Sequence, residues 1–264
     1  MLTILLLLIF GVFSGVTTVL FGFGGGFVAV PLIYRLVSNA HPTEAMHIAV
    51  ATSTAVMVAN SLYSTYRHHK SKYVVWKYVF PIGLYIALGA VLGVSMSMSL
   101  DDRTIRYMFV AYLAATILDS LLRKGFLNEL KERQIKMPSG KRQLVYGIVI
   151  GSIATLLGVG GSVMTVPLLR RLGSSMKTAV VMANPLSVPV AIVGTLLYAV
   201  LGYYSGVRLG SGYVGYINVT AFATLVGAGY IGISLAGRWL PKIPDGAHAR
   251  AYLTFLTIAL FSMI

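Results

Sequence analysis

Of the 264 residues in the chain, 57% are apolar and only 11% are charged, against roughly a quarter charged in a soluble domain, which indicates a polytopic membrane protein. The formal net charge of +14 does not indicate nucleic-acid binding, because the basic residues fall in short segments between apolar runs, as in cytoplasmic loops. No cysteine is present, which excludes disulfides and thiolate metal sites.

The apolar runs predict an all-α membrane fold. Because no basic segment or clear cleavage site accompanies the first run, we expect a retained membrane helix there and not a signal peptide. The predicted helices span 2–21, 27–37, 43–66, 74–100, 104–122, 143–157, 162–172, 178–201, 211–236 and 250–264. Each half therefore holds a broken or short helix pair and three long transmembrane helices.

A glycine-rich segment occurs once in each half. GFGGGFVAVPL at 22–32 returns as GVGGSVMTVPL at 158–168, with six of eleven positions identical. The small residues Ala45, Ala49 and Ser53 likewise match Ala179, Ala183 and Ser187. We therefore predict two repeats, 1–122 and 143–264, joined by a basic linker at 123–142.

The distribution of basic residues favours inverted repeats. If the linker is cytoplasmic and the repeats are inverted, 17 basic residues lie inside and 4 outside; parallel repeats would give 12 and 9. The positive-inside rule thus places both termini on the periplasmic or exterior side of the inner membrane.

Each glycine segment is expected to break a helix within the membrane. The helices that restart at Phe27 and Val163 would present free N–H groups and a positive dipole end, which favour an anion. Tight helix packing or a simple kink is the alternative. Pro31 and Pro167 are interpreted as structural breaks, and neither segment matches a nucleotide-binding loop.

Polar residues inside two long helices are further candidates for the site. Thr52 and Ser53 lie in one, and Asn184 and Ser187 lie in the other, where Pro185 is expected to disrupt the helix. Hydroxyls and amides can bind oxyanions without burying a charge, although hydrogen bonds between helices are the common role for such residues.

Ionisable groups in the apolar runs are few. His47 is a candidate for proton coupling, or an interfacial residue bonded to backbone. No known catalytic motif is present, so we expect neither an enzyme nor a cofactor or metal.

The tandem glycine segments, each with a proline five or six residues beyond the last glycine, are followed by TEA or KTA triplets; an ATS stretch also follows the first copy. This pattern resembles the TauE/SafE family over nearly the whole chain. The resemblance implies transport of sulfite, organosulfonates or related small anions. Ser162 stands where the first copy has a third glycine, so the two halves need not contact substrate equally.

Together these features predict a secondary transporter of a small sulfur-containing anion, with an anion channel as the alternative and a membrane enzyme or scaffold a weaker one. Its partners would be the anion and the lipid bilayer, without nucleic acid. The candidate substrate-binding residues are Gly24, Gly25, Gly26, Phe27, Thr52, Ser53, Gly160, Gly161, Ser162, Asn184 and Ser187. The candidate structural breaks are Gly22, Pro31, Gly158, Pro167 and Pro185.

Overall fold

The computed structural model describes residues 2–72, 74–122, 126, 140–207, 209–237 and 243–264, which form ten helices and one two-stranded hairpin. In the first half the helices are α1 (Leu2–Phe21), α2 (Gly26–Val37), α3 (Ala45–Lys70), α4 (Trp76–Ser97) and α5 (Asp102–Leu122). In the second half they are α6 (Lys141–Leu157), α7 (Ser162–Arg171), α8 (Met176–Tyr204), α9 (Val219–Ala236) and α10 (Asp245–Met263). Strands β1 (Tyr213–Val214) and β2 (Ile217–Asn218) pair antiparallel before α9.

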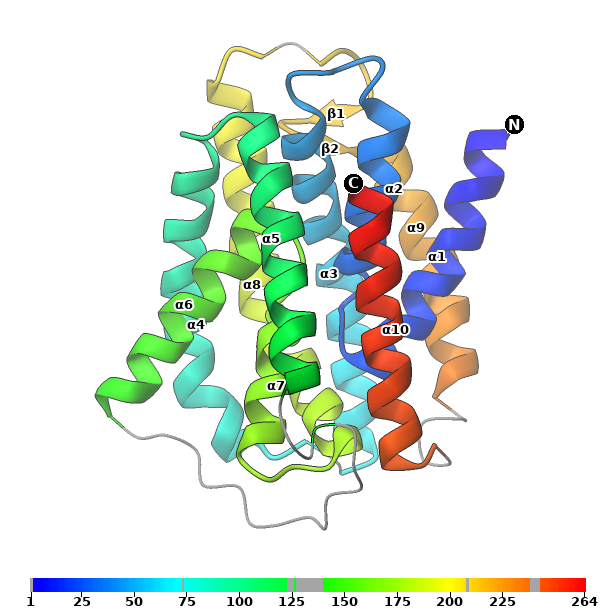
Figure 1. Cartoon of the computed structure of the whole chain (residues 1–264). Coiled ribbons are helices and arrows are strands. Elements are labelled where there is room, and N and C mark those ends of the chain that lie inside the picture. Colours follow the sequence, from blue (N-terminus) through cyan, green and yellow to red (C-terminus); the bar gives the residue numbers. More distant parts are fainter. Residues whose placement is uncertain (1, 73, 123–125, 127–139, 208, 238–242) are drawn as a thin grey trace.

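The helices form one bundle with two distinct ends (Figure 1). Both chain termini and the hairpin lie at one end, called here the termini end. At the opposite end, the linker end, α5 finishes and α6 begins. Most of the linker 123–142, together with Arg208, Arg238 and Lys242, lies outside the described residues.

Six helices are long and apolar enough to cross a bilayer, namely α1, α3, α4, α5, α8 and α9. An all-α polytopic membrane protein is thus confirmed. The most apolar window is 83% buried in α3 and 61% in α8, against 44% or less in the other four. α3 and α8 therefore form the centre of the bundle, and the other spans surround them.

Equivalent helices of the two halves make equivalent contacts. α1 packs closely on α9, where a Cβ on Gly15 would lie 2.1 Å from the Gly229 carbonyl oxygen. α6 packs on α4 in the same way, and a Cβ on Gly151 would lie 2.0 Å from the Ile86 oxygen. Figure 1 shows α1 starting at the termini end and α6 at the linker end, an arrangement that inverted repeats would produce.

Two predictions of local structure are wrong. The helix expected from residue 211 begins at Val219, because glycines with positive φ, among them Gly212 and Gly215, fold the preceding segment into the hairpin. The expected disruption at Pro185 is also absent, since α8 continues through it. Proline is tolerated in membrane helices where neighbouring helices surround the freed backbone groups, as at the centre of this bundle.

Pro31 and Pro167 likewise lie inside helices, in α2 and α7, and neither ends its helix. The breaks themselves come from the glycines. α1 ends at Phe21 before Gly22, and α6 ends at Leu157 before Gly158, both glycines having positive φ. Both short helices thus restart inside the bundle, as the sequence predicts.

The glycine contact between α1 and α9 has a testable consequence. Gly15→Ala is expected to lower the thermal-unfolding midpoint of the purified protein, because the added methyl would meet backbone, and such overpacking costs about 1–3 kcal/mol. Gly227→Ala on α9 is the matched control, since no heavy atom lies within 4 Å of its Cβ position. Equal midpoints for the two variants would contradict the close packing.

Candidate functional site

The first break consists of the four residues between α1 and α2. Gly22, Gly24 and Gly25 have φ of 74°, 64° and 86°, a region that side-chain-bearing residues rarely adopt. The first bond that reaches back from α2 is from Ala29 N to Gly25 O at 3.1 Å. The N–H groups of Gly26, Phe27 and Val28 consequently have no acceptor within α2, as at the start of any α-helix, although a hydrogen-bonded turn at Gly24 and Gly25 engages one of them.

The second break is built similarly. Gly158 and Gly160 have φ of 66° and 69°, and α7 begins at Ser162. Met164 and Thr165 both donate to Gly161 O, at 3.2 and 2.8 Å. The N–H groups of Ser162 and Val163 likewise have no acceptor within α7, although both residues are fully buried. Buried N–H groups at the start of a helix need an acceptor from outside the helix, and a turn, a water or a ligand can supply it.

The two breaks lie against each other in the middle of the bundle. A Cβ on Gly26 would lie 2.6 Å from Gly158 O, and one on Gly160 would lie 3.3 Å from Phe23 O. Met57 of α3 touches both, with its sulfur 2.6 Å and 2.9 Å from the same two Cβ positions. Segments separated by more than a hundred residues therefore share one site, bounded by the central helix α3.

Four of the polar side chains predicted from sequence lie beside the breaks. Ser53 Oγ donates to Gly158 O at 2.8 Å, and Ser187 Oγ lies 3.4 Å from the Cβ position of Gly160. Asn184 Nδ2 donates to Thr18 O near the end of α1 at 3.2 Å, whereas its Oδ1 is buried without a partner. Ser162 Oγ, at the start of α7, is also buried and unpartnered.

Two predicted residues are oriented elsewhere. Thr52 Oγ1 accepts from Asn218 N at 2.9 Å, so this hydroxyl anchors the hairpin and the start of α9. The Phe27 ring stacks on Phe23 at 4.6 Å between centroids and belongs to an aromatic cluster that includes Tyr252. For Phe27 only the backbone N–H is available to a ligand.

Three polar residues outside the predicted set surround the first break. Asn60 Nδ2 donates to Ser14 Oγ, and Ser14 Oγ donates to Gly25 O, both at 3.3 Å. Ser61 Oγ is buried and unpartnered, 2.6 Å from the Cβ position of Gly24. Asn60 and Ser61 belong to the same predicted helix as Thr52 and Ser53, whereas nothing in the sequence showed that Ser14 faces this break.

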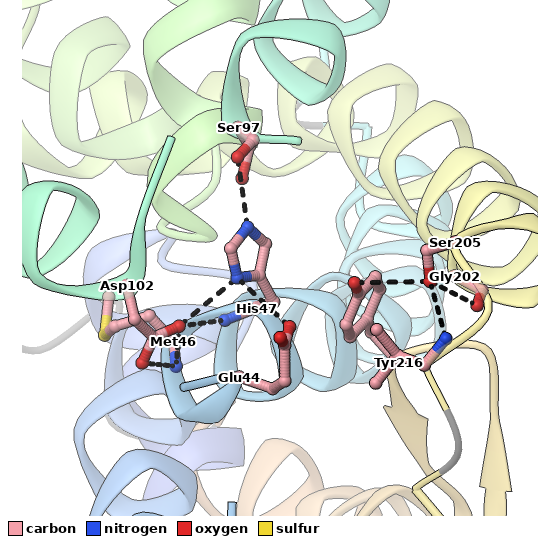
Figure 2. Close-up of polar contacts among 9 residues, drawn as sticks. Glu44, Met46, His47, Ser97, Asp102, Gly202, Ser205 and Tyr216 are labelled. Atoms are coloured by element: carbon pink, nitrogen blue, oxygen red, sulfur yellow. Dashed lines mark hydrogen bonds and ion pairs between the residues drawn. The ribbon is translucent and has the colours of Figure 1, made fainter. Parts of the chain in front are cut away.

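His47 lies at a separate place, near the start of α3 and about 15 Å along the helix from Met57. Figure 2 shows its ring between Asp102 of α5 and the Ser97 carbonyl of α4. Nδ1 lies 3.2 Å from Asp102 Oδ1, and Nε2 lies 3.0 Å from Ser97 O. Both ring nitrogens face acceptors, an arrangement that suits the doubly protonated ring.

A cavity of about 560 Å³ opens beside His47 at the termini end. Its lining includes Glu44, Asp101, Asp102 and Tyr216. The hydrogen bond from Thr104 lowers the pKa of Asp101, and burial raises the pKa of the Tyr216 hydroxyl. The cavity therefore carries several carboxylates, whereas the central breaks carry only neutral groups. Among the described residues no three His, Cys, Asp or Glu side chains group as a metal site.

Comparison with known proteins gives the family. The model of the sulfite exporter TauE/SafE family matches residues 7–263, nearly the whole chain. The chain belongs to the TauE/SafE family. It is 28% identical to a probable membrane transporter protein of Haemophilus influenzae, over 98% of this chain and 97% of that protein. It is 25% identical to one of Methanocaldococcus jannaschii, over 90% and 88%, and 24% identical to one of Bacillus subtilis, over 92% of each.

This TauE/SafE protein is thus a membrane transporter, as its relatives are named. Its two breaks have unequal surroundings. A Cβ on Gly25 would lie 2.3 Å from Ser14 Oγ and 2.5 Å from Asn60 Nδ2. At the equivalent Gly161 the nearest atom is a methyl carbon of Ile150, 3.3 Å away. Polar side chains therefore crowd Gly25 of the first break, whereas an aliphatic side chain is nearest to Gly161 of the second.

Proposed function

We propose that this protein is a secondary transporter of a small sulfur-containing anion, sulfite or an organosulfonate. The observation that carries the proposal is that α2 and α7 both start inside the bundle, against each other, with buried N–H groups that their own helices leave without acceptors. Those groups and the two helix dipoles would hold an anion where the breaks meet, near mid-membrane. The family description, which names sulfite, supports the choice of anion class.

The side chains around the breaks are neutral hydrogen-bond donors, which suit both the binding and the release of an anion. Ser14, Asn60 and Ser61 lie beside the first break, and Ser53 and Ser187 lie beside the second. None of these residues is charged, so an oxyanion would be hydrogen-bonded without a permanent counter-ion. An anion held in this way can leave when the surrounding helices move, as a transport cycle requires.

Alternating access between two inverted repeats is the proposed mechanism. Repeat 1 (1–122) and repeat 2 (143–264) would move relative to each other. The site formed by both breaks would open first to one side of the membrane and then to the other. The contacts α1–α9 and α4–α6 each join one repeat to the other in the same way, which supports the internal repeat. The linker 123–142 would be cytoplasmic and the termini periplasmic, since this orientation puts 17 of the 21 basic residues on the cytoplasmic side of the inner membrane.

Counterflow in proteoliposomes tests the function. Vesicles loaded with unlabelled sulfite should take up labelled sulfite against its gradient, and sulfoacetate and taurine should be assayed in parallel. A transporter gives transient accumulation, whereas an anion channel gives only equilibration. Equilibration without an overshoot for every anion that permeates would reject the transporter in favour of the channel.

His47 is proposed as the proton-coupling residue, because its ring links Asp102 and the Ser97 carbonyl at the mouth of the acidic cavity. His47→Gln should preserve counterflow, which needs no driving ion, and should abolish anion accumulation driven by a pH gradient. Both assays can be run on one proteoliposome preparation, so each serves as the control for the other. Undiminished gradient-driven accumulation in the variant would exclude His47 as the coupling group.

A further inference from the structure

A row of buried polar atoms without partners runs along the linker half of α3. They are Ser61 Oγ, Ser64 Oγ, Thr65 Oγ1 and His68 Nε2, and their residues are at most 8% exposed. The four residues are called here the polar stripe. Their spacing of three, four and seven residues puts them on one helix face. Hydroxyls inside membrane helices ordinarily bond to the preceding turn, as Thr54 Oγ1 does to Ala51 O at 2.8 Å.

The polar stripe begins at the central site and ends at a basic surface. Ser61 lies beside Gly24, and the same helix face continues through Met57, which touches both breaks. About 10 Å further along α3, His68 lies close enough to Arg67 and Lys177 to interact with them electrostatically. The stripe therefore joins the proposed anion site to cationic groups at the linker end.

The equivalent face of α8, toward the termini end, is closed. Thr195 corresponds to Ser61 and also has an unpartnered hydroxyl. The positions equivalent to Ser64 and His68 are Tyr198, which is fully buried and donates to Thr155 O, and Gly202. Gly202 packs directly against the hairpin, where a Cβ would lie 2.7 Å from Tyr216 N. On α3 these positions therefore carry polar groups without partners. On α8 the equivalent positions carry the Tyr198 ring and the close contact of Gly202 with the hairpin.

We propose that the polar stripe lines the route by which the substrate passes between the central breaks and the linker end. This inference rests on the proposed transport of a small oxyanion and adds the path and its lining. The hydroxyls have no hydrogen-bond partner in this conformation, and a partly hydrated anion on the route would supply one. The route is closed in this conformation and opens when the halves move apart on this side.

The natural absence of cysteine allows a direct test. Ser64→Cys and Thr65→Cys would each be the only thiol in the chain, and membrane-impermeant methanethiosulfonates would be applied to the linker side of transporting proteoliposomes. We expect modification at both positions. With rates normalised to those of a free thiol in water, a sulfonate-bearing reagent should react about tenfold faster than a trimethylammonium one, because the basic mouth concentrates anions. Leu62→Cys is the matched control, since this residue is exposed on the outer surface, where lipid would suppress the thiolate.

Flux provides the second readout. Ser64→Ala and Thr65→Val should each lower anion flux severalfold and leave binding in detergent unchanged, because these two residues lie beyond Ser61, toward the linker end, and outside the central site. Absence of labelling in single-cysteine variants that transport, or unchanged flux in Ser64→Ala and Thr65→Val, would overturn the route. Failure of the proposed function would give a different result. The unmodified protein would then carry no oxyanion, while labelling of Ser64→Cys and Thr65→Cys would still report an aqueous path.

Discussion

Gly25→Ala is expected to abolish anion flux, whereas Gly161→Ala at the equivalent place in the second half should retain most of it. Gly25 has φ of 86°, where a side chain costs about 1–2 kcal/mol, and its Cβ would also lie 2.3 Å from Ser14 Oγ. The methyl would therefore displace Ser14 or Asn60, or shift the start of α2. Either change removes the alignment of the free N–H groups with the second break.

Gly161 differs in both respects. Its φ of −64° suits any residue, and the nearest atom to its Cβ position, a methyl carbon of Ile150, is 3.3 Å away. Initial rates of labelled-anion counterflow, with protein quantified by size-exclusion chromatography in detergent, would compare the two variants. Equal loss in both variants would show that the two breaks contribute symmetrically and would contradict the unequal surroundings described above.

Asp245→Ala is expected to cause the largest loss of stability from a single charge. Asp245 pairs with Arg170 at 2.6 Å, and the Arg170 side chain is only 1% exposed. Breaking a buried ion pair from one side costs about 3–5 kcal/mol, because a charge remains buried without its partner. Arg170 retains the carbonyl of Phe126 as an acceptor, so we expect a value near the lower limit.

The neighbouring ion pair supplies the control. Arg171 pairs with Asp119 at the same distance of 2.6 Å, but these side chains are 51% and 41% exposed. Asp119→Ala should therefore change stability by only about 0–1 kcal/mol. Thermal-unfolding midpoints in one detergent would show the difference. A loss in Asp119→Ala as large as in Asp245→Ala would mean that burial does not determine the contribution of these pairs.

Much of the fold could be predicted from the sequence because membrane spans are encoded locally. Long apolar runs gave the six spans, and the clustered glycines gave the two helix ends at Phe21 and Leu157. The hairpin before α9 was not predicted, since Gly212 and Gly215 lie next to the apolar residues of a membrane helix and were included in that helix. The helix disruption predicted at Pro185 was wrong for a related reason, because the effect of a proline depends on which helices surround it.

The site was less predictable than the fold. Repetition of the glycine segments identified both breaks, but contacts between distant segments determine which side chains line them. Ser14 faces Gly25 only because α1 packs behind the start of α2, and Thr52 faces Asn218 only because the hairpin folds over α3. Asp102, which accepts from Met46 N at 2.7 Å and lies beside His47, was not singled out, because nothing in its local sequence links it to α3.

Hydrogen–deuterium exchange of the purified protein, with and without the anion that supports counterflow, tests the proposed site most directly. Binding at the free N–H groups should slow exchange in peptides covering both 22–32 and 158–168, because those amides would gain an acceptor. Gly25→Ala should lose this protection at both segments. Protection confined to other regions, such as the cavity beside His47, would contradict an anion site formed by the two glycine breaks.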